Sequence, residues 1–218
     1  MKRIASALCA LSMLAAISCN DTATDTSAKG DSTANKTDTT AKIETPAPAP
    51  DSAAMMKAWM EYMTPGEMHK VLALQNGAWT GDITLWMAPD APAQTSKGTS
   101  VNKMIFGGRY QESRYSGNFM GQPMEGLGIT AYDNAKKKFV SNWLDNMGTG
   151  IMSLEGTYDP ATKTINLSGK MVDPTTGKEC DIRETLTFVD DKHHTMEMFV
   201  TQGSAKEYKS MEIKFTKK

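Results

Sequence analysis

From Gly77 to the end of the chain, apolar and polar residues alternate with a period of two. The stretches 82–87 and 164–171 show the alternation clearly, and this period is typical of strands that bury one face. Turn-forming Gly, Pro, Asn and Asp residues interrupt the alternation at regular intervals. The segment 77–218 therefore predicts about ten antiparallel strands joined by hairpins.

A meander of this length has exposed edges unless it closes on itself. Closure removes the edges and surrounds an interior, as in up-and-down barrels. An open sheet is less favoured, because two short helices are too small to bury the strand residues of a flat sheet of this size. We expect an all-β fold, an up-and-down, calycin-like β-barrel of about ten antiparallel strands with two short N-terminal helices.

The segment 51–76, which precedes the strands, has helical character. Large apolar residues between Met56 and Met63 recur at helical spacing and predict a first helix with one apolar stripe, which we expect to be packed. The order Thr64-Pro65-Gly66-Glu67 resembles a capping box with proline at the first helical position. It predicts a second helix, capped by Thr64, that ends near Leu74. We expect both helices at one mouth of the barrel.

The first 18 residues have the order of a bacterial lipoprotein signal peptide. Lys2 and Arg3 precede an apolar run, and small residues lead to Cys19. The run is shorter than the roughly 20 residues that a spanning helix needs. The resemblance to lipoprotein leaders implies cleavage before Cys19 and acylation of its sulfur, and two or three acyl chains anchor a protein stably. The alternative is ordinary cleavage that leaves an unmodified cysteine.

Residues 19–50 are mostly Thr, Ala, Asp, Ser and Lys and end in alternating Pro and Ala. This composition buries too little apolar surface to offset the entropy of ordering, so it predicts a disordered tether, which the resemblance to lipoprotein leaders implies is lipidated at Cys19. Asn20, rather than Asp, follows Cys19, and by resemblance to known leaders this favours sorting to the outer membrane. We therefore expect a cell-envelope protein bound to the lipid bilayer through Cys19.

Charge and cysteine content narrow the functional classes. A formal net charge of −1 argues against a nucleic-acid partner, which requires a basic face. Once Cys9 leaves with the leader and Cys19 is acylated, Cys180 is the one free thiol, and we interpret it as a small core residue. The sequence has no nucleophile motif, no phosphate-binding loop and no His-x-x-x-His. We identify no catalytic residue and expect no cofactor.

Two strands carry polar and aromatic side chains on a single face. Glu112 and Arg114 share a face of the strand that starts at Tyr110, and Trp143 and Asp145 share a face of another. Aromatic residues prefer burial, so these faces are candidates for the inner wall; the alternative is that both pairs face water. The candidate ligand-binding residues are Arg109, Glu112, Arg114, Trp143 and Asp145.

A metal site is also conceivable at His193 and His194, which Met196 and Met198 follow. Thioethers and an imidazole on one strand face would suit Cu(I), which prefers soft ligands. Acidic residues flank the set, however, and a pair of turn histidines is the better interpretation. We expect no metal.

Several motifs in a fixed order resemble one bacterial family. These motifs are Phe106-Gly107-Gly108-Arg109-Tyr110, Met120 to Gly126, Tyr132-Asp133-Asn134 and Trp143 to Met152. They are similar to the family called domain of unknown function 1579, and the likeness extends over nearly the whole domain. The resemblance implies a lipocalin-like barrel without an established activity or a known metal.

The leading hypothesis is a lipid-anchored barrel that binds or carries a small amphipathic ligand. A second hypothesis is a structural or protein-interaction module whose interior is filled by its own side chains. A third, less favoured, is an envelope hydrolase, because a site assembled from separate strands leaves no local signature. A contiguous pocket of some hundreds of Å³ inside the barrel favours the first hypothesis, and a filled interior favours the second. The sequence indicates no oligomeric state.

Overall fold

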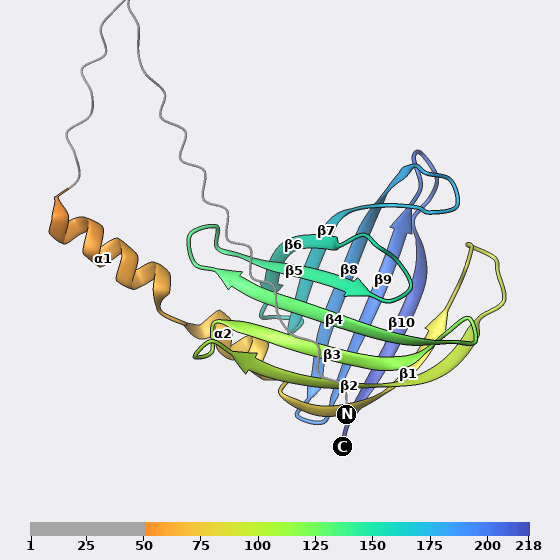
Figure 1. The fold of residues 1–218 in the computed structure, drawn as a ribbon, viewed down its shortest axis with the longest axis horizontal. Helices are drawn as coiled ribbons and strands as arrows, with labels where there is room; N and C mark the ends of the chain where they lie inside the picture. The colour runs from red at the N-terminus through yellow and green to blue at the C-terminus, as the bar shows by residue number, and fades with distance from the viewer. Residues whose placement is uncertain (1–50) are drawn as a thin grey trace, which may run out of the picture. The chain divides into compact units, whose positions relative to one another are not determined.

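The computed structural model describes residues 51–218, which contain two helices and ten strands (Figure 1). The predicted signal peptide 1–18, the predicted acylation site Cys19 and the rest of the predicted tether, to residue 50, lie outside the described residues. Within residues 51–218 no helix has the length and apolar character needed to cross a membrane.

The ten strands form a closed barrel in which every strand pairs with its neighbours in the sequence, and the first strand pairs with the last. All of these pairs are antiparallel. The strands are β1 (Gly77–Leu85), β2 (Gln94–Ile105), β3 (Tyr110–Phe119), β4 (Gln122–Asp133), β5 (Lys138–Asp145), β6 (Met152–Asp159), β7 (Thr164–Val172), β8 (Glu179–Asp190), β9 (His193–Thr201) and β10 (Tyr208–Lys217). The predicted up-and-down barrel is confirmed.

Strand β8 shows how the period of two sorts side chains between the two faces of the barrel. Ile182 and Phe188 face inward and are buried, whereas Asp181 faces outward and is exposed. Cys180 also faces inward and is buried, which confirms its predicted place in the core. Residues that are paired across neighbouring strands lie on the same face of the sheet. The strand pairing therefore shows, for every strand, which residues face the interior.

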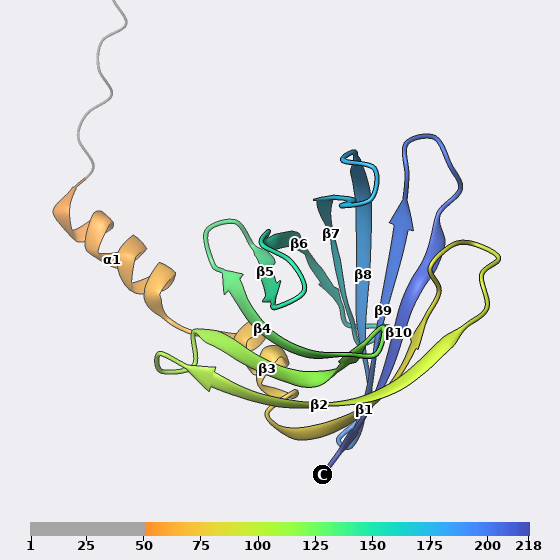
Figure 2. The same ribbon diagram turned by 45° about the vertical axis from the view of Figure 1, so that its right-hand side comes forward.

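The hydrophobic core lies on the inner wall of β5 to β8 and beneath the second helix. Its buried members are Leu72, Phe139, Leu154, Ile165, Leu167, Cys180, Ile182 and Phe188. Leu72 comes from the helix and the others from strands, so the helix packs against one end of the barrel (Figure 2).

The first helix, α1 (Ser52–Met63), is capped by Asp51, whose carboxylate accepts a hydrogen bond from the Ala53 backbone N–H. The prediction that its apolar stripe is packed is wrong, because none of its residues is buried. Trp59, for example, is 60% exposed. Helical spacing reports that a helix is amphipathic, but it does not say whether a partner covers the apolar face.

The second helix, α2 (Glu67–Ala73), starts after Gly66 rather than after the predicted cap, Thr64. The Thr64 hydroxyl instead donates to the Met60 carbonyl oxygen at 2.6 Å and so serves the end of α1. His69 Nδ1 accepts a hydrogen bond from the Gly66 backbone N–H at 3.0 Å. Gln111 of β3 donates its side-chain amide to the carbonyl oxygen of Leu72, which fixes α2 to the barrel.

Candidate functional site

Three of the predicted ligand-binding residues do not lie on the inner wall. Glu112 and Arg114 face outward, where the guanidinium donates to the carboxylate at 2.9 and 3.3 Å. Lys103 Nζ lies 3.3 Å from the same carboxylate. These cations, Arg114 first, hold the pKa of Glu112 below its usual range. Arg109 lies in the turn between β2 and β3 and donates to the Phe106 carbonyl oxygen at 3.1 Å.

The inner face of β3 is polar. For this reason the sequence pattern suggested the face of Glu112 and Arg114 as the inner one, although that face points outward. Gln111 is buried and bonded to α2, and the hydroxyl of Ser113 donates to Asn102 Oδ1 at 2.6 Å. Ser100 donates to the same oxygen, so these inward polar groups satisfy one another. Tyr110, the aromatic residue that suggested an inward face, is 40% exposed at the strand end.

Trp143 and Asp145 do face inward, as predicted, and they bond to each other. The indole Nε1–H of Trp143 donates to Asp145 Oδ2 at 2.7 Å, and the other carboxylate oxygen accepts from the Met147 backbone N–H at 2.9 Å. Tyr115 of β3 meets the indole edge-on, with the ring centroids 6.2 Å apart. Burial raises the pKa of the Tyr115 hydroxyl. The five predicted residues are thus divided between the inner and outer faces of the barrel.

Glycines give these two aromatic rings room to lie flat on the inner wall. A methyl group at Gly126 would overlap the Trp143 ring, and one at Gly98 or Gly117 would overlap the Tyr115 ring. Around Gly98, Gly117 and Gly126 the inner wall is therefore backbone covered by two rings, with the Asp145 carboxylate beside the indole.

Glu184 is an inward-facing titratable residue that the sequence reasoning missed. It lies on the inner face of β8 between Ile182 and Leu186, and its partners across the sheet are Leu167 of β7 and Met198 of β9. No hydrogen bond or ion pair reaches its carboxyl group from any residue that the structure describes. Glu184 keeps part of its surface exposed, but its apolar neighbours remove water from around the carboxyl group, and this desolvation raises the pKa of Glu184 to about 7.

Apolar side chains near Glu184 keep part of their surface accessible although they point into a closed barrel. They are Leu186 of β8 and Met196, Met198 and Val200 of β9. By contrast Ile165 and Ile182, on the same inner face, are only 1% exposed. The inner wall of β8 and β9 therefore carries a group of apolar side chains that are less buried than the members of the core.

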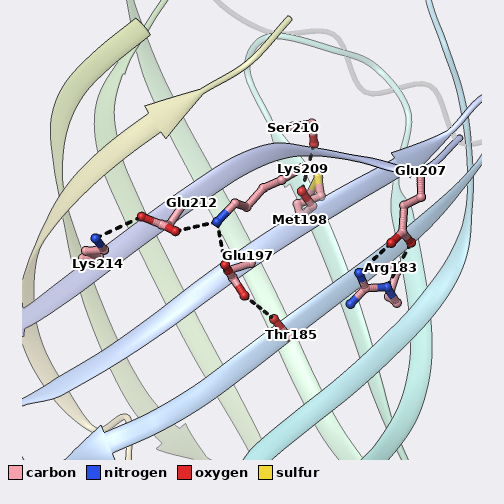
Figure 3. A network of polar contacts seen from close by, with 9 residues as sticks. All are labelled: Arg183, Thr185, Glu197, Met198, Glu207, Lys209, Ser210, Glu212 and Lys214. Atoms are coloured by element: carbon pink, nitrogen blue, oxygen red, sulfur yellow. Dashed lines mark hydrogen bonds and ion pairs between the residues drawn. The ribbon is translucent and has the colours of Figure 1, made fainter. Parts of the chain in front are cut away.

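The outer face of β8 to β10 carries a network of ion pairs (Figure 3). Arg183 forms a bidentate pair with Glu207 at 2.9 and 2.7 Å, and Lys209 bridges Glu197 and Glu212 at 2.8 and 2.7 Å. A shallow hollow of about 360 Å³ lies beside the Arg183 pair. The charged groups of this network are already neutralised by one another, so it offers a ligand little unpaired charge.

The two neighbouring histidines lie on opposite faces of β9. His194 is buried between Trp79 and Phe215, and burial lowers its pKa to about 4. His193 is exposed and pairs with Asp190 at 2.9 Å, an ion pair only when the ring is protonated. Among residues 51–218, no three His, Cys, Asp or Glu side chains are arranged so that they could hold a metal ion.

The fold and its inner wall define a class, a closed up-and-down barrel with an isolated carboxyl group in an apolar interior. The chain belongs to the family described as "Protein of unknown function (DUF1579)", whose sequence model matches residues 64–217. No curated protein matches the chain. A solved structure of a redesigned beta barrel is similar, with 13% identity over 70% of this chain and 99% of that chain, and a TM-score of 0.38.

Proposed function

We propose that this protein binds a small amphipathic molecule inside its calycin-like barrel, and that acylated Cys19 tethers it to the membrane of the cell envelope. The observation that carries the binding proposal is the inner wall around Glu184, where accessible apolar side chains surround a carboxyl group without a partner. Ligand sites combine apolar walls with a few polar groups that orient the ligand, and this wall has both.

The competing function is a structural or interaction module filled by its own side chains. The buried inner wall of β6 and β7 fits that function. Leu186, Met196 and Met198 are only partly buried, and this fits an interior that receives a ligand better than one filled by its own side chains. An unpaired carboxyl group in a sealed interior would also cost folding free energy without a compensating contact.

The binding proposal is tested with N-phenyl-1-naphthylamine, a neutral dye that fluoresces in apolar surroundings. We expect the mature chain without its acylated first residue, beginning at Asn20, to bind the dye saturably, with about one dye per barrel. Met196→Trp adds a large ring to the inner wall and should abolish this binding. Val189→Trp adds the same ring at an exposed position of β8, which is 57% exposed, and should leave binding unchanged.

Circular dichroism must show that both variants keep the barrel. Equal binding to the wild type and to Met196→Trp would place the dye outside the barrel. Absence of saturable binding to the wild type would favour the self-filled module instead.

The membrane tether is tested separately by labelling cells with an alkynyl fatty acid. We expect the label on the wild-type protein and on Cys180→Ala, because Cys180 is buried in the core. Cys19→Ala should carry no label. Persistent labelling of Cys19→Ala would refute acylation at this residue.

A further inference from the structure

The inner wall of the barrel carries negative charge and almost no positive charge. The strands place two carboxyl groups inside, Glu184 on β8 and Asp145 on β5. The one inward lysine or arginine among the strand residues is Lys217, which is exposed and lies over the Trp79 ring at the α2 end. All other strand lysines and arginines face outward, as Arg183 and Lys209 do in Figure 3.

The two inward carboxyl groups differ in how they are satisfied. Asp145 accepts hydrogen bonds from the Trp143 indole and from the Met147 backbone, so both of its oxygens have donors. Glu184 has none among the residues that the structure describes. The groups that face it are Leu167 from β7, Met198 from β9, and Ile182 and Leu186 from its own strand, and none of them can titrate or donate. Beyond these neighbours, the titratable inward residues of β8 and β9 are Cys180 and His194.

An isolated carboxyl group of this kind favours a particular ligand chemistry. A protonated amine offers it both a positive charge and a hydrogen-bond donor, and charge-assisted hydrogen bonds are among the strongest in proteins. The surrounding apolar walls strengthen the attraction once the ligand covers them, because the ligand displaces water that would otherwise screen it. A carboxylate headgroup at this position would meet another carboxyl group and find no cation among its neighbours. A hydroxyl headgroup could form a hydrogen bond but would not gain the charge.

We propose that Glu184 makes the barrel interior selective for amphipathic molecules that carry a protonated amine, an inference that rests on the binding function proposed above. The apolar part of the ligand covers the accessible Leu186, Met196 and Met198, while its ammonium group bonds to Glu184. Glu184 is then a specificity-determining residue, and the outer ion-pair network takes no part in binding.

The test uses three probes with the same twelve-carbon chain, which are dodecylamine, dodecanol and dodecanoate. Each displaces N-phenyl-1-naphthylamine from the mature chain at pH 7.5, below its micelle concentration. We expect the wild type to bind dodecylamine at least tenfold more tightly than dodecanoate. In Glu184→Gln this preference should fall to threefold or less, while the affinity for dodecanol stays within threefold. Glu179→Gln, an exposed position on the same strand, should retain the wild-type preference.

A preference for dodecylamine that survives in Glu184→Gln would overturn the selectivity proposal while leaving the binding function intact. Binding of all three probes with equal affinity to the wild type would do the same. If neither the dye nor any probe binds to the wild type, the proposed binding function itself fails. The affinity for dodecanol therefore separates the two failures.

A second measurement does not depend on any variant. Because Glu184 holds a proton in part of the population near neutral pH, pairing with an ammonium group must release that proton. Calorimetry at pH 7 in buffers of different ionisation enthalpy should show proton release when dodecylamine binds and none when dodecanol binds. Dodecylamine binding without proton release would contradict a role for Glu184.

Discussion

The indole of Trp79 lies edge-on to the imidazole of His194, with the ring centroids 4.3 Å apart. Phe215 stacks on the other side of the imidazole at 4.6 Å. These rings come from β1, β9 and β10, so they join the first strand of the barrel to its last two. Trp79 Nε1 also donates to the Gln75 carbonyl oxygen at 2.7 Å, which links the strand to the chain after α2. The seam that closes the barrel is therefore packed with aromatic rings.

Loss of the indole at this seam should be costly. Trp79 is 1% exposed, and replacing a buried tryptophan with alanine removes about 3–5 kcal/mol of stability. We expect Trp79→Ala to lower the free energy of unfolding in urea by this amount. Trp59→Ala on α1 is the matched control, because its side chain is 60% exposed and should change stability by at most about 0.5 kcal/mol. Equal losses in the two variants would contradict the packing described for both residues.

Buried His194 should make the protein sensitive to acid. Burial lowers its pKa from 6.5 to about 4, so between these pH values the ring is neutral in the folded protein and protonated in the unfolded chain. Stability should therefore fall as the pH drops from about 6.5 to about 4, by up to about 3 kcal/mol. His194→Phe keeps a ring between Trp79 and Phe215 and should remove this component. Urea unfolding at several pH values would test it, with His193→Gln as the exposed control, and an unchanged slope in His194→Phe would argue against a buried neutral ring.

Glu184 should act in the opposite direction. Burial raises its pKa from 4.5 to about 7, so the folded protein holds a proton that the unfolded chain has lost. Stability should fall as the pH rises from about 4.5 to about 7, by up to about 3 kcal/mol. Glu184→Gln removes the ionisation and should be more stable than the wild type at pH 8, but close to it at pH 4. Urea unfolding measures this difference, and a variant that is less stable at pH 8 would mean that the carboxylate has a stabilising partner.

The fold could be predicted because its determinants are local. The alternation along β8 shows which of its residues face the core, and turn residues mark the strand ends. The cap of α2 could not be predicted in this way. Thr64 has the right residue type, but the Met60 carbonyl oxygen lies within reach of its hydroxyl and takes that hydrogen bond. A short motif describes one set of possible bonds, and the backbone around it decides which set forms.

The candidate site was harder to predict because its polar residues depend on partners distant in sequence. Gln111 and Ser113 can face inward because α2 and β2 supply their hydrogen-bond partners, which no local pattern reveals. Glu112 and Arg114 then occupy the outer face. Glu184 did carry a local signal, since it interrupts the apolar, inward-facing series of β8. A single carboxyl group in such an apolar series is a candidate functional residue, because burying a carboxyl group without a partner costs folding free energy.

The inner-wall glycines make a final prediction about the two aromatic rings. A methyl group at Gly126 would overlap the Trp143 ring, so Gly126→Ala must displace the indole and strain its hydrogen bond to Asp145. We expect a loss of about 1–3 kcal/mol in the free energy of unfolding, as for other overpacked sites. Gly128→Ala, two residues along the same strand, meets Ser113 Cβ at 3.4 Å and the indole at 3.5 Å, which are ordinary contacts.

Gly128→Ala should therefore change stability by at most about 1 kcal/mol, and reduced freedom of the unfolded chain would offset part of any loss. Urea unfolding gives the stability of both variants, and tryptophan emission gives the environment of the indole. The same glycine variants are also made in a protein that carries Trp143→Phe. An emission change that is lost in that protein comes from Trp143. If Gly126→Ala is as stable as Gly128→Ala and leaves the emission of Trp143 unchanged, the ring does not lie on the backbone of β4. Aromatic packing against glycine would then not shape this wall.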